Sequence, residues 1–201
     1  MGTWLHFVHL FRTPLPVMLD KRQLILASAL KVLGKDGYGG LTQPKVARMA
    51  GLRQSHLTYY FPSRLDLVKA VAQLAMTRQL AALDELLADA SGAEAAIRVA
   101  TLLGRKENAR VLLSLVQAAD QEAEIQSLFR EFAVQMRARA AALLSKQSGQ
   151  TIPPQNAFLL HALSVGLAVL GLALGEAEGD EARKAETLGV AIQWLSGADG
   201  S

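Results

Sequence analysis

A run of polar residues that contains no acid, residues 53–60, is the part of this sequence best equipped to bind a chemically defined partner. It reads Arg-Gln-Ser-His-Leu-Thr-Tyr-Tyr and is followed by Phe61. If the run is helical, Leu57 and Phe61 lie one turn apart and make its buried contact, and the other side chains form a hydrogen-bonding surface. Such a surface suits phosphates and base edges, since Gln can pair with adenine in bidentate fashion and Arg prefers guanine.

The residues just before this run predict a second helix that would hold it in place. Thr42 can cap an orphan N–H, and Pro44 falls in the first turn, where its missing N–H costs nothing. Val46, Ala47 and Ala50 would be buried. Gly51 can take a positive φ and end the helix, after which Leu52 anchors the turn. Two short helices joined by a tight turn form a helix-turn-helix, which places its second helix in a DNA groove.

The same stretch carries a family resemblance over roughly residues 20–70. It is similar to the N-terminal domain of the TetR family of bacterial one-component transcriptional regulators in these residues: Gly37, Tyr38, Thr42, Val46, Ala47, Ala50, Gly51, Leu52, Leu57, Tyr60, Phe61, Arg64 and Leu67. The sequence departs from the family pattern at Arg53, where a capping Ser or Thr is usual, and at Thr58, where an aromatic residue is usual. The resemblance implies three helices for DNA and six for ligand binding and dimerisation.

Roles in DNA binding follow from the resemblance and from the chemistry of each side chain. Thr42, Tyr59, Tyr60 and Arg64 match positions that commonly face the sugar-phosphate backbone in the family. At the leading end of the expected recognition helix, Gln54, Ser55 and His56 would meet bases, with Arg53 serving either role and Thr58 completing the surface. Tyr60 has an alternative interpretation as a partly buried aromatic cap, and Tyr38 is expected in the core.

Charge is distributed unevenly along the chain. Residues 1–78 hold 11 Lys plus Arg against 3 Asp plus Glu, net +8, whereas residues 79–201 hold 10 against 15, net −5. A basic part joined to an acidic remainder is typical of a nucleic-acid-binding domain attached to a domain with another task. The alternative is a solvated helical surface with uneven charge.

Composition argues against several other classes of protein. The chain has 201 residues, 51% of them hydrophobic and 19% charged, which is enough for a large core. Cysteine is absent, so disulfides and thiolate chemistry are excluded, and the four histidines show no metal-ligand spacing. No Ser/His/Asp set, glycine-rich phosphate loop or paired buried carboxylates is recognisable. We therefore expect no enzyme activity, no metal and no cofactor, and a cytoplasmic protein.

Two apolar segments need an interpretation. Residues 1–19 lack a basic region ahead of the apolar run and a small-residue cleavage site, so they do not match a signal peptide. They form an extension that is either a functional arm or the product of a start codon assigned too early. Residues 157–174 are marginal for a membrane span and lack basic or aromatic flanks, so a helix buried on all sides, in a core or a subunit interface, is expected.

The remaining pattern predicts helices throughout and no required strand. Expected helices cover residues 20–35, 63–89, 107–119, 122–146, 154–174 and 180–194, with a shorter one that starts at Ser91 and ends at Gly104. With the two helices of the helix-turn-helix, the count is nine. We predict an all-α protein with an extension (residues 1–19), a helix-turn-helix domain (20–66) and a helical ligand-binding and dimerisation domain (67–201).

A symmetric dimer is expected because one recognition helix reaches only a few base pairs. In the TetR family the last two helices pair as a four-helix bundle across the two-fold axis. The alternative is that they fill the core of one subunit. The expected interface residues are Leu159, Leu163, Gly166, Leu167, Leu170, Gly171, Leu174, Leu188, Ile192 and Leu195.

The resemblance also implies an effector pocket in the helical domain. Its candidate lining is Met76, Leu103, Leu112, Leu115, Val116, Phe129, Phe132, Met136, Phe158 and His161. The sequence thus predicts a DNA-binding transcriptional regulator, a repressor that binds a pseudo-palindromic operator as a homodimer and is released by a small molecule. The alternative is a ligand-independent DNA-binding or scaffold protein.

Overall fold

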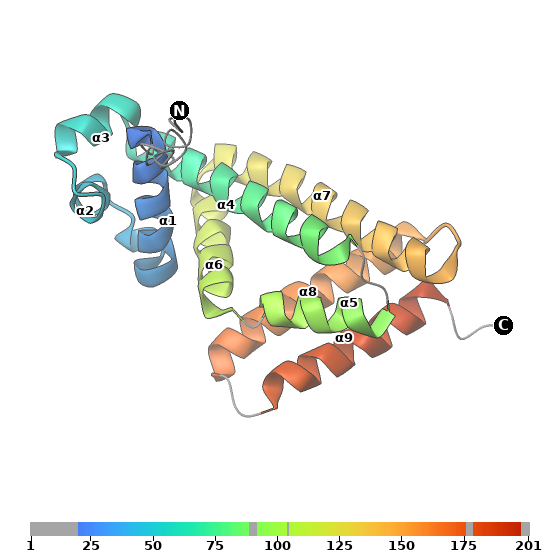
Figure 1. The fold of residues 1–201 in the computed structure, drawn as a ribbon. Helices are drawn as coiled ribbons and strands as arrows, with labels where there is room; N and C mark the ends of the chain where they lie inside the picture. Colours follow the sequence, from blue (N-terminus) through green and yellow to red (C-terminus); the bar gives the residue numbers. More distant parts are fainter. Residues whose placement is uncertain (1–19, 89–91, 104, 176–178, 198–201) are drawn as a thin grey trace, which may run out of the picture.

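A computed structural model describes residues 20–88, 92–103, 105–175 and 179–197, and within them every regular element is an α-helix (Figure 1). The predicted all-α class and the division into three N-terminal and six C-terminal helices are therefore confirmed for the described residues. The helices are α1 Lys21–Gly40, α2 Gln43–Met49, α3 Gln54–Tyr60, α4 Arg64–Leu87, α5 Gly92–Leu103, α6 Lys106–Gln121, α7 Ala123–Ser148, α8 Pro154–Leu174 and α9 Asp180–Ser196.

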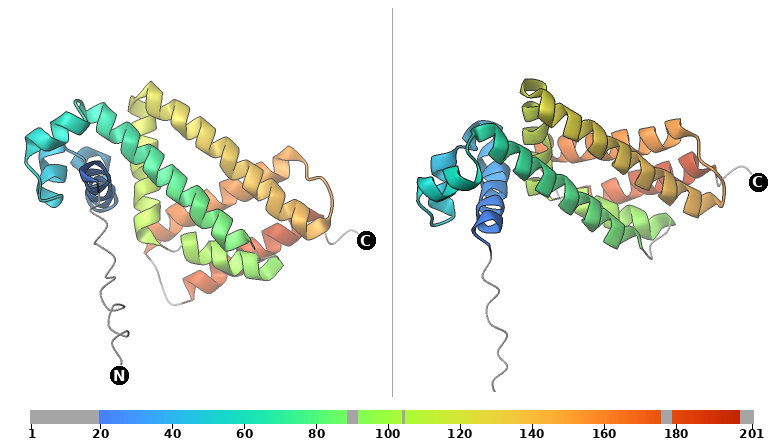
Figure 2. Two further views of the ribbon diagram at one scale, coloured as in Figure 1. Left: turned by 45° about the horizontal axis from the view of Figure 1, so that its top comes forward. Right: turned by 90° about the horizontal axis from the view of Figure 1, so that it is seen from above.

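Helices α1 to α3 form a small unit at one end of the molecule (Figures 1 and 2). Asp20 caps α1 by accepting a hydrogen bond from the Arg22 N–H. The helix is interrupted at Gly37, whose φ of 71° lies in the left-handed region that glycine tolerates. This break turns Tyr38 into the core, where it is 3% exposed, as expected from the sequence.

The long helix α4 leads from this unit into the larger helical part. Its start has a capping box, since the Asp66 N–H donates to Ser63 Oγ and the Ser63 N–H donates to the Asp66 carboxylate. These bonds from Ser63 lower the pKa of Asp66. The box fixes where α4 begins, directly after the recognition helix.

Helices α4 and α7 lie side by side along the larger part, and α5, α8 and α9 cross beside them (Figures 1 and 2). Arg139 of α7 donates two hydrogen bonds to the Asp84 carboxylate of α4, at 2.7 and 2.6 Å, which joins the two long helices. Asn156 of α8 donates to the Leu195 carbonyl of α9 at 2.7 Å. Helix α6 runs from the end of α5 to the start of α7, and a Cβ built on Gly34 of α1 would be in ordinary van der Waals contact with Val111 of α6.

The buried residues form two clusters. One joins α1 to α4 with α6 and the start of α7, around Ile25, Val32 and Leu67. The other joins α5, α7, α8 and α9, around Leu144, Leu188 and Ile192. The molecule thus has one core beneath the helix-turn-helix and a second beneath the last two helices.

Helix α8 is not buried on all sides within one chain. Its length and composition would allow it to cross a membrane, but one such helix is only weak evidence for a membrane protein. In its most apolar window, 17% of the residues are buried. Only Ala157, Leu160 and Ala168 are buried. The core of a single subunit therefore covers only part of α8, and the rest of the helix is left for the expected subunit interface.

Most expected helix bounds agree with the structure to within a few residues. The predicted first helix, residues 20–35, continues to Gly40 across the break at Gly37, because Tyr38 to Gly40 form a further turn that carries Tyr38 inward. The expected start of α5 at Ser91, its end at Gly104 and the extension 1–19 lie outside the described residues.

Candidate DNA-binding surface and ligand cavity

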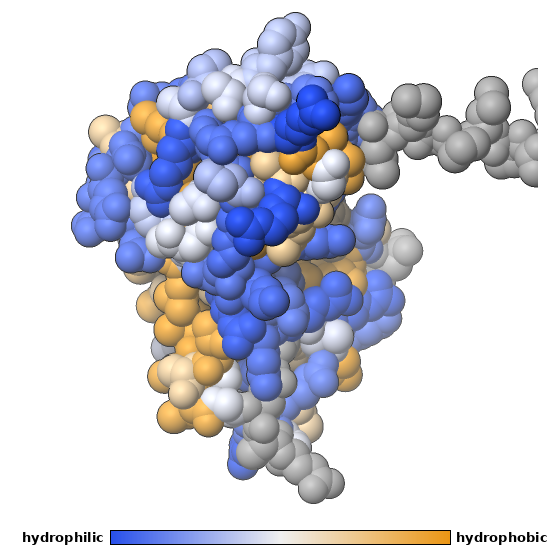
Figure 3. All heavy atoms as spheres, turned by 90° about the vertical axis from the view of Figure 1, so that its left-hand side faces the viewer, coloured by the Kyte–Doolittle hydropathy of each residue, from blue (hydrophilic) through white to orange (hydrophobic). Residues whose placement is uncertain are grey.

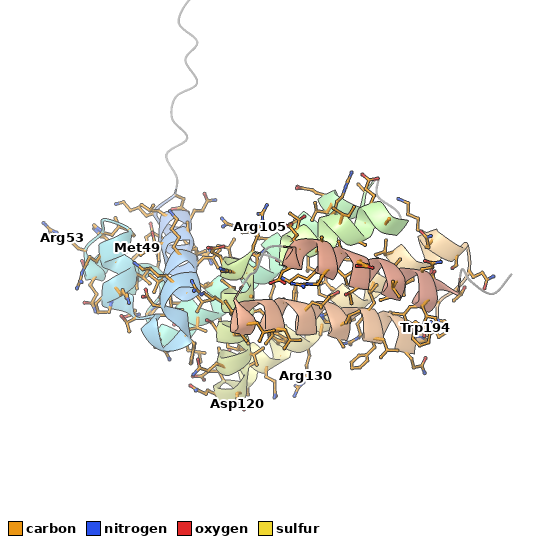
Figure 4. The ribbon with its side chains drawn as sticks, turned by 90° about the horizontal axis from the view of Figure 1, so that it is seen from below. Met49, Arg53, Arg105, Asp120, Arg130 and Trp194 are labelled. Atoms are coloured by element: carbon orange, nitrogen blue, oxygen red, sulfur yellow. The ribbon has the colours of Figure 1, made fainter. Side chains whose placement is uncertain are left out.

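The outer face of α3 is polar and exposed. Within this helix only Leu57 is buried, and Gln54, Ser55 and His56 are all exposed at its first turn, where base contacts were expected. Arg53 precedes the helix and projects from the end of the molecule (Figure 4). No Asp or Glu occurs between Asp36 and Asp66. The surface over this end is largely hydrophilic (Figure 3), so it can meet an anion without repulsion.

Two hydrogen bonds hold α2 and α3 in place. Gly51 has a φ of 66°, and this left-handed turn lets the Leu52 N–H donate to the Ala47 carbonyl at 2.9 Å. The Gln43 side chain donates to the Phe61 carbonyl at 2.8 Å, tying the start of α2 to the end of α3. Sequence reasoning missed the Gln43 bond because it joins positions 18 residues apart.

The hydroxyl of Thr42 does not cap α2, in contrast to the expectation from its position. Thr42 is the residue before the helix, but its side chain accepts no capping bond. Pro44 is the second helical residue and has no N–H to donate, which removes one of the two usual partners of a capping oxygen. Thr42 is exposed, so its hydroxyl remains available to a phosphate.

The two tyrosines at the end of α3 differ in their surroundings. Tyr59 is 81% exposed, whereas Tyr60 is half-buried and packs against the core of the small unit. Their rings meet edge to face with centroids 5.2 Å apart. Thr58 is exposed but donates its hydroxyl proton to the Gln54 carbonyl at 3.1 Å. Tyr59 therefore offers the freest hydroxyl of the three.

Arg64 has a structural role that the sequence did not predict. Its guanidinium lies over the Tyr38 ring and donates to the Tyr38 hydroxyl at 3.1 Å, the Tyr38 carbonyl at 2.9 Å and the Leu41 carbonyl at 3.2 Å. A guanidinium has five N–H donors, so two remain for a phosphate. Arg64 thus ties the start of α4 to the end of α1, and its free N–H groups can still meet a phosphate.

A cavity of about 770 Å³ lies between α1, α4, α6, α7 and α8. Its size falls in the range of small-molecule pockets. Eight of the ten residues expected to line a pocket do line it: Met76, Leu112, Leu115, Val116, Phe129, Phe132, Met136 and His161. Phe158 does not, because it lies on the outer side of α8 and is 55% exposed. The side chain of Leu103 lies outside the described residues.

The cavity wall also includes residues that sequence reasoning missed. Helix α1, expected to serve only the DNA-binding part, contributes Ala27, Leu30, Lys31, Gly34 and Lys35. Leu30 is half-buried, packs against the core of the small unit and lines the cavity. Among the polar lining residues, burial and the nearby positive charge of Arg137 lower the pKa of His161, so its imidazole is neutral near pH 7.

The expected interface residues fall on two different faces. Leu188, Ile192 and Leu195 of α9 are buried inside one chain against α5, α7 and α8. Their assignment to a subunit interface is therefore corrected: the opposite face of α9 carries Val190 and Trp194, which are 64% and 73% exposed. On α8, Leu170 and Leu174 are exposed, Leu159 is 49% exposed, and these residues are half-buried: Leu163, Gly166, Leu167 and Gly171.

Comparison with known proteins agrees with this geometry. Residues 25–71 match the family model described as bacterial regulatory proteins, tetR family, which covers α1 to α3 and the start of α4. This part of the chain is a TetR-type DNA-binding domain. Among curated proteins, none matches significantly.

Solved structures extend the similarity of this chain beyond the helix-turn-helix. A transcriptional regulator from Rhodococcus sp. Rha1 is 20% identical, with a TM-score of 0.76 over 88% of this chain and 96% of that one. The multidrug binding protein EbrR, complexed with imidazole, is 26% identical (TM-score 0.64; 86% and 95% covered). A TetR-family member from Streptomyces coelicolor A3 is 25% identical (TM-score 0.63; 86% and 98% covered). The larger helical part therefore shares its fold with these proteins.

Proposed function

We propose that this regulator is a repressor that binds a pseudo-palindromic operator as a homodimer and leaves it when a small molecule fills the cavity. The observation that carries the proposal is that one cavity wall includes α1 of the DNA-binding unit and α4, α6, α7 and α8 of the larger part. A ligand in this cavity touches both units. It can favour one relative placement of the two units over another, and such a difference in binding is what a ligand-driven switch requires.

Contacts with DNA divide into two groups in this proposal. Gln54, Ser55 and His56, with Arg53, enter the major groove and meet base edges because they form the exposed first turn of α3. Contacts to phosphate come from side chains that flank this turn and end in a hydroxyl or a charge. These are Thr42, Thr58, Tyr59, Tyr60 and Arg64.

Dimerisation occurs through an apolar surface on α8 and α9 in this proposal. The two helices lie side by side on one face of the molecule, with Trp194 near one end (Figure 4). This α8–α9 face includes the exposed or half-buried residues Phe158, Leu159, Leu163, Gly166, Leu170, Leu174, Val190 and Trp194. A contiguous apolar surface of this kind on a globular protein marks an interaction site. A second copy of the same face would cover it symmetrically.

We also propose a division at residues 66 and 67, between a DNA-binding domain and a ligand-binding and dimerisation domain. A cytoplasmic location and the lack of enzyme activity belong to the same proposal.

EbrR is described as a multidrug binding protein and was solved with imidazole, which supports a small-molecule site in proteins of this fold. The rival proposal, ligand-independent DNA binding, leaves the 770 Å³ cavity without a purpose.

Operator binding tests the proposal most directly. The DNA flanking the gene is searched for an inverted repeat, and fluorescence anisotropy compares the full repeat, one half-site and a scrambled duplex. We expect tight binding of the full repeat, with half-sites centred about one helical turn apart or a little more. Equal affinity for all three duplexes would contradict sequence-specific regulation. A small molecule that binds the cavity but never weakens operator binding would favour the ligand-independent rival.

A further inference from the structure

The edge of the cavity carries a cluster of positive charge. Five basic side chains contribute to its lining, from three separate elements, against a single acid, Glu107. All five are exposed, as expected at a mouth open to solvent rather than in a sealed core. We call them the mouth cations: Lys31, Lys35, Arg78, Arg105 and Arg110.

No described residue forms an ion pair with the mouth cations. Among the described residues none of them forms an ion pair or a side-chain hydrogen bond, and neither does the Glu107 carboxylate. Other basic residues of this larger part do find acids: Lys69 pairs with Glu124, Arg98 with Glu94, and Arg139 with Asp84. The cluster therefore combines like charges with no internal partner, an arrangement that an anion would stabilise.

Close packing of α1 on α6 brings cations of both helices to one rim. A Cβ built on Gly34 would lie 3.6 Å from Val111 Cγ2 and 3.9 Å from the Glu107 carbonyl oxygen. Lys31 and Lys35 lie on α1 on either side of Gly34, and Arg110 precedes Val111 on α6. Arg105 stands at the start of α6 and projects outward at the edge of the molecule (Figure 4). Both helices thus contribute cations to the lining of the same cavity.

The opposite wall has a different character. Helices α7 and α8 contribute no charged residue to the lining, and His161 is neutral because burial and Arg137 lower its pKa. Apolar side chains dominate this wall: Phe129, Phe132 and Met136 from α7, and Val165 and Ala168 from α8. His161 and Ser164 supply hydrogen-bonding groups, but the Ser164 hydroxyl already donates to the Leu160 carbonyl at 2.8 Å. A ligand body in contact with this wall is apolar.

We infer that the effector is an amphipathic anion, with an apolar body against α7 and α8 and a carboxylate or similar acidic group among the mouth cations. This rests on the proposed function, in which the cavity is the effector site. Lys and Arg hold oxyanions by charge-assisted hydrogen bonds, and the exposed position of the cations leaves them accessible to an anion that enters from solvent.

Three probes that share one alkyl chain isolate the role of the head group: decanoate, decanol and decyltrimethylammonium. Binding to the full chain is measured by calorimetry without DNA, below the concentrations at which the probes aggregate. We expect decanoate to bind about tenfold more tightly than decanol, and the cation to bind most weakly. Since the mouth cations are exposed, the advantage of decanoate should shrink as salt increases. Equal affinities, or a preference for the cation, would overturn the inference.

Charge-removing variants locate the anion. Lys35→Gln and Arg105→Gln should each weaken decanoate binding severalfold and leave decanol binding unchanged, which also reports that the cavity is intact. Arg130→Gln is the matched control: Arg130 is exposed on α7, does not line the cavity and lies on the opposite edge of the molecule from Arg105 (Figure 4). An equal loss in the control would mean that general surface charge attracts the probe, against the inference.

The same protein separates this inference from the proposed function. A chain that binds its operator but none of the three probes would overturn the amphipathic anion and leave the regulator intact. A chain that binds decanoate through the mouth cations but shows no sequence preference on DNA would overturn the proposed regulator and leave the cavity as a site for an amphipathic anion.

Discussion

The guanidinium of Arg64 lies 4.3 Å from the centroid of the Tyr38 ring and donates to both the hydroxyl and the carbonyl of that residue. Tyr38 follows the break in α1 and Arg64 begins α4, so this contact joins the two helices that enclose α2 and α3. Arg64, which is expected to face the DNA backbone, thus also helps to hold the recognition helix α3 in position.

Replacing Arg64 should therefore lower stability as well as DNA affinity. Arg64→Ala removes three hydrogen bonds and a cation–π contact, partly exposed, and should reduce the free energy of unfolding by about 2 kcal/mol. Arg53→Ala is the control, because Arg53 is exposed and makes no side-chain capping bond. Urea denaturation monitored by circular dichroism compares the two. If both variants match the unaltered chain in stability, Arg64 serves only as a phosphate contact.

Base reading and phosphate binding should respond to different substitutions. Gln54→Ala should weaken operator binding by about 1–3 kcal/mol per half-site and spare binding to random DNA, because it removes a base contact. Tyr59→Phe removes only one exposed hydroxyl and should weaken binding to both DNAs alike. Anisotropy titrations on both duplexes measure this. Proportional losses in the two variants would contradict the division.

How much of the fold and of the site could be predicted from the sequence depended on the clarity of the local pattern. The recognition helix has a single buried position, Leu57, among exposed polar residues, so the sequence alone was enough to assign its outer face. Arg64 and Tyr38 could not be paired, because they are 26 residues apart and their contact requires the folded unit. Local periodicity reports on faces, and long-range contacts need the packing.

The buried faces of the last two helices could not be predicted from the sequence either. Helix α8 is apolar around most of its circumference, so periodicity could not tell which face meets the subunit core. On α9, Leu188 and Trp194 are both large and apolar, yet one is 0% and the other 73% exposed. Likewise, Phe158 is 55% exposed outside the cavity, whereas Phe129 is half-buried and lines it. The distinction arises from how the helices cross, which residue type alone does not encode.

Acidification should weaken the fold through His161. The unfolded chain takes up a proton on this residue near pH 6.5, whereas burial and Arg137 keep the folded imidazole neutral to lower pH. The unfolded state then binds more protons, so the free energy of unfolding falls as pH drops through this window. His161→Gln cannot titrate and should lose less stability between pH 7.5 and about 5.5. Asp66 and Asp84, whose pKa values are lowered, act only below about pH 4.

Denaturation curves at several pH values measure the effect. Identical pH dependence in the two chains would mean that the His161 imidazole titrates as freely in the folded state as in the unfolded chain.

Gly166 offers the sharpest test of assembly. No heavy atom lies within 4 Å of a Cβ built on it, so a larger side chain fits within one subunit and must project from the α8–α9 face. Gly166→Arg should place an unpaired charge in the proposed interface at a cost of about 3–5 kcal/mol, giving a folded monomer with poor operator affinity. Leu188→Arg is the contrasting variant, since Leu188 is 0% exposed inside one chain and its replacement should unfold the domain. Analytical ultracentrifugation and circular dichroism distinguish the outcomes. A Gly166→Arg chain that stays dimeric with full helicity would place the interface elsewhere. One that unfolds as Leu188→Arg does would assign this part of α8 to the core of a single subunit.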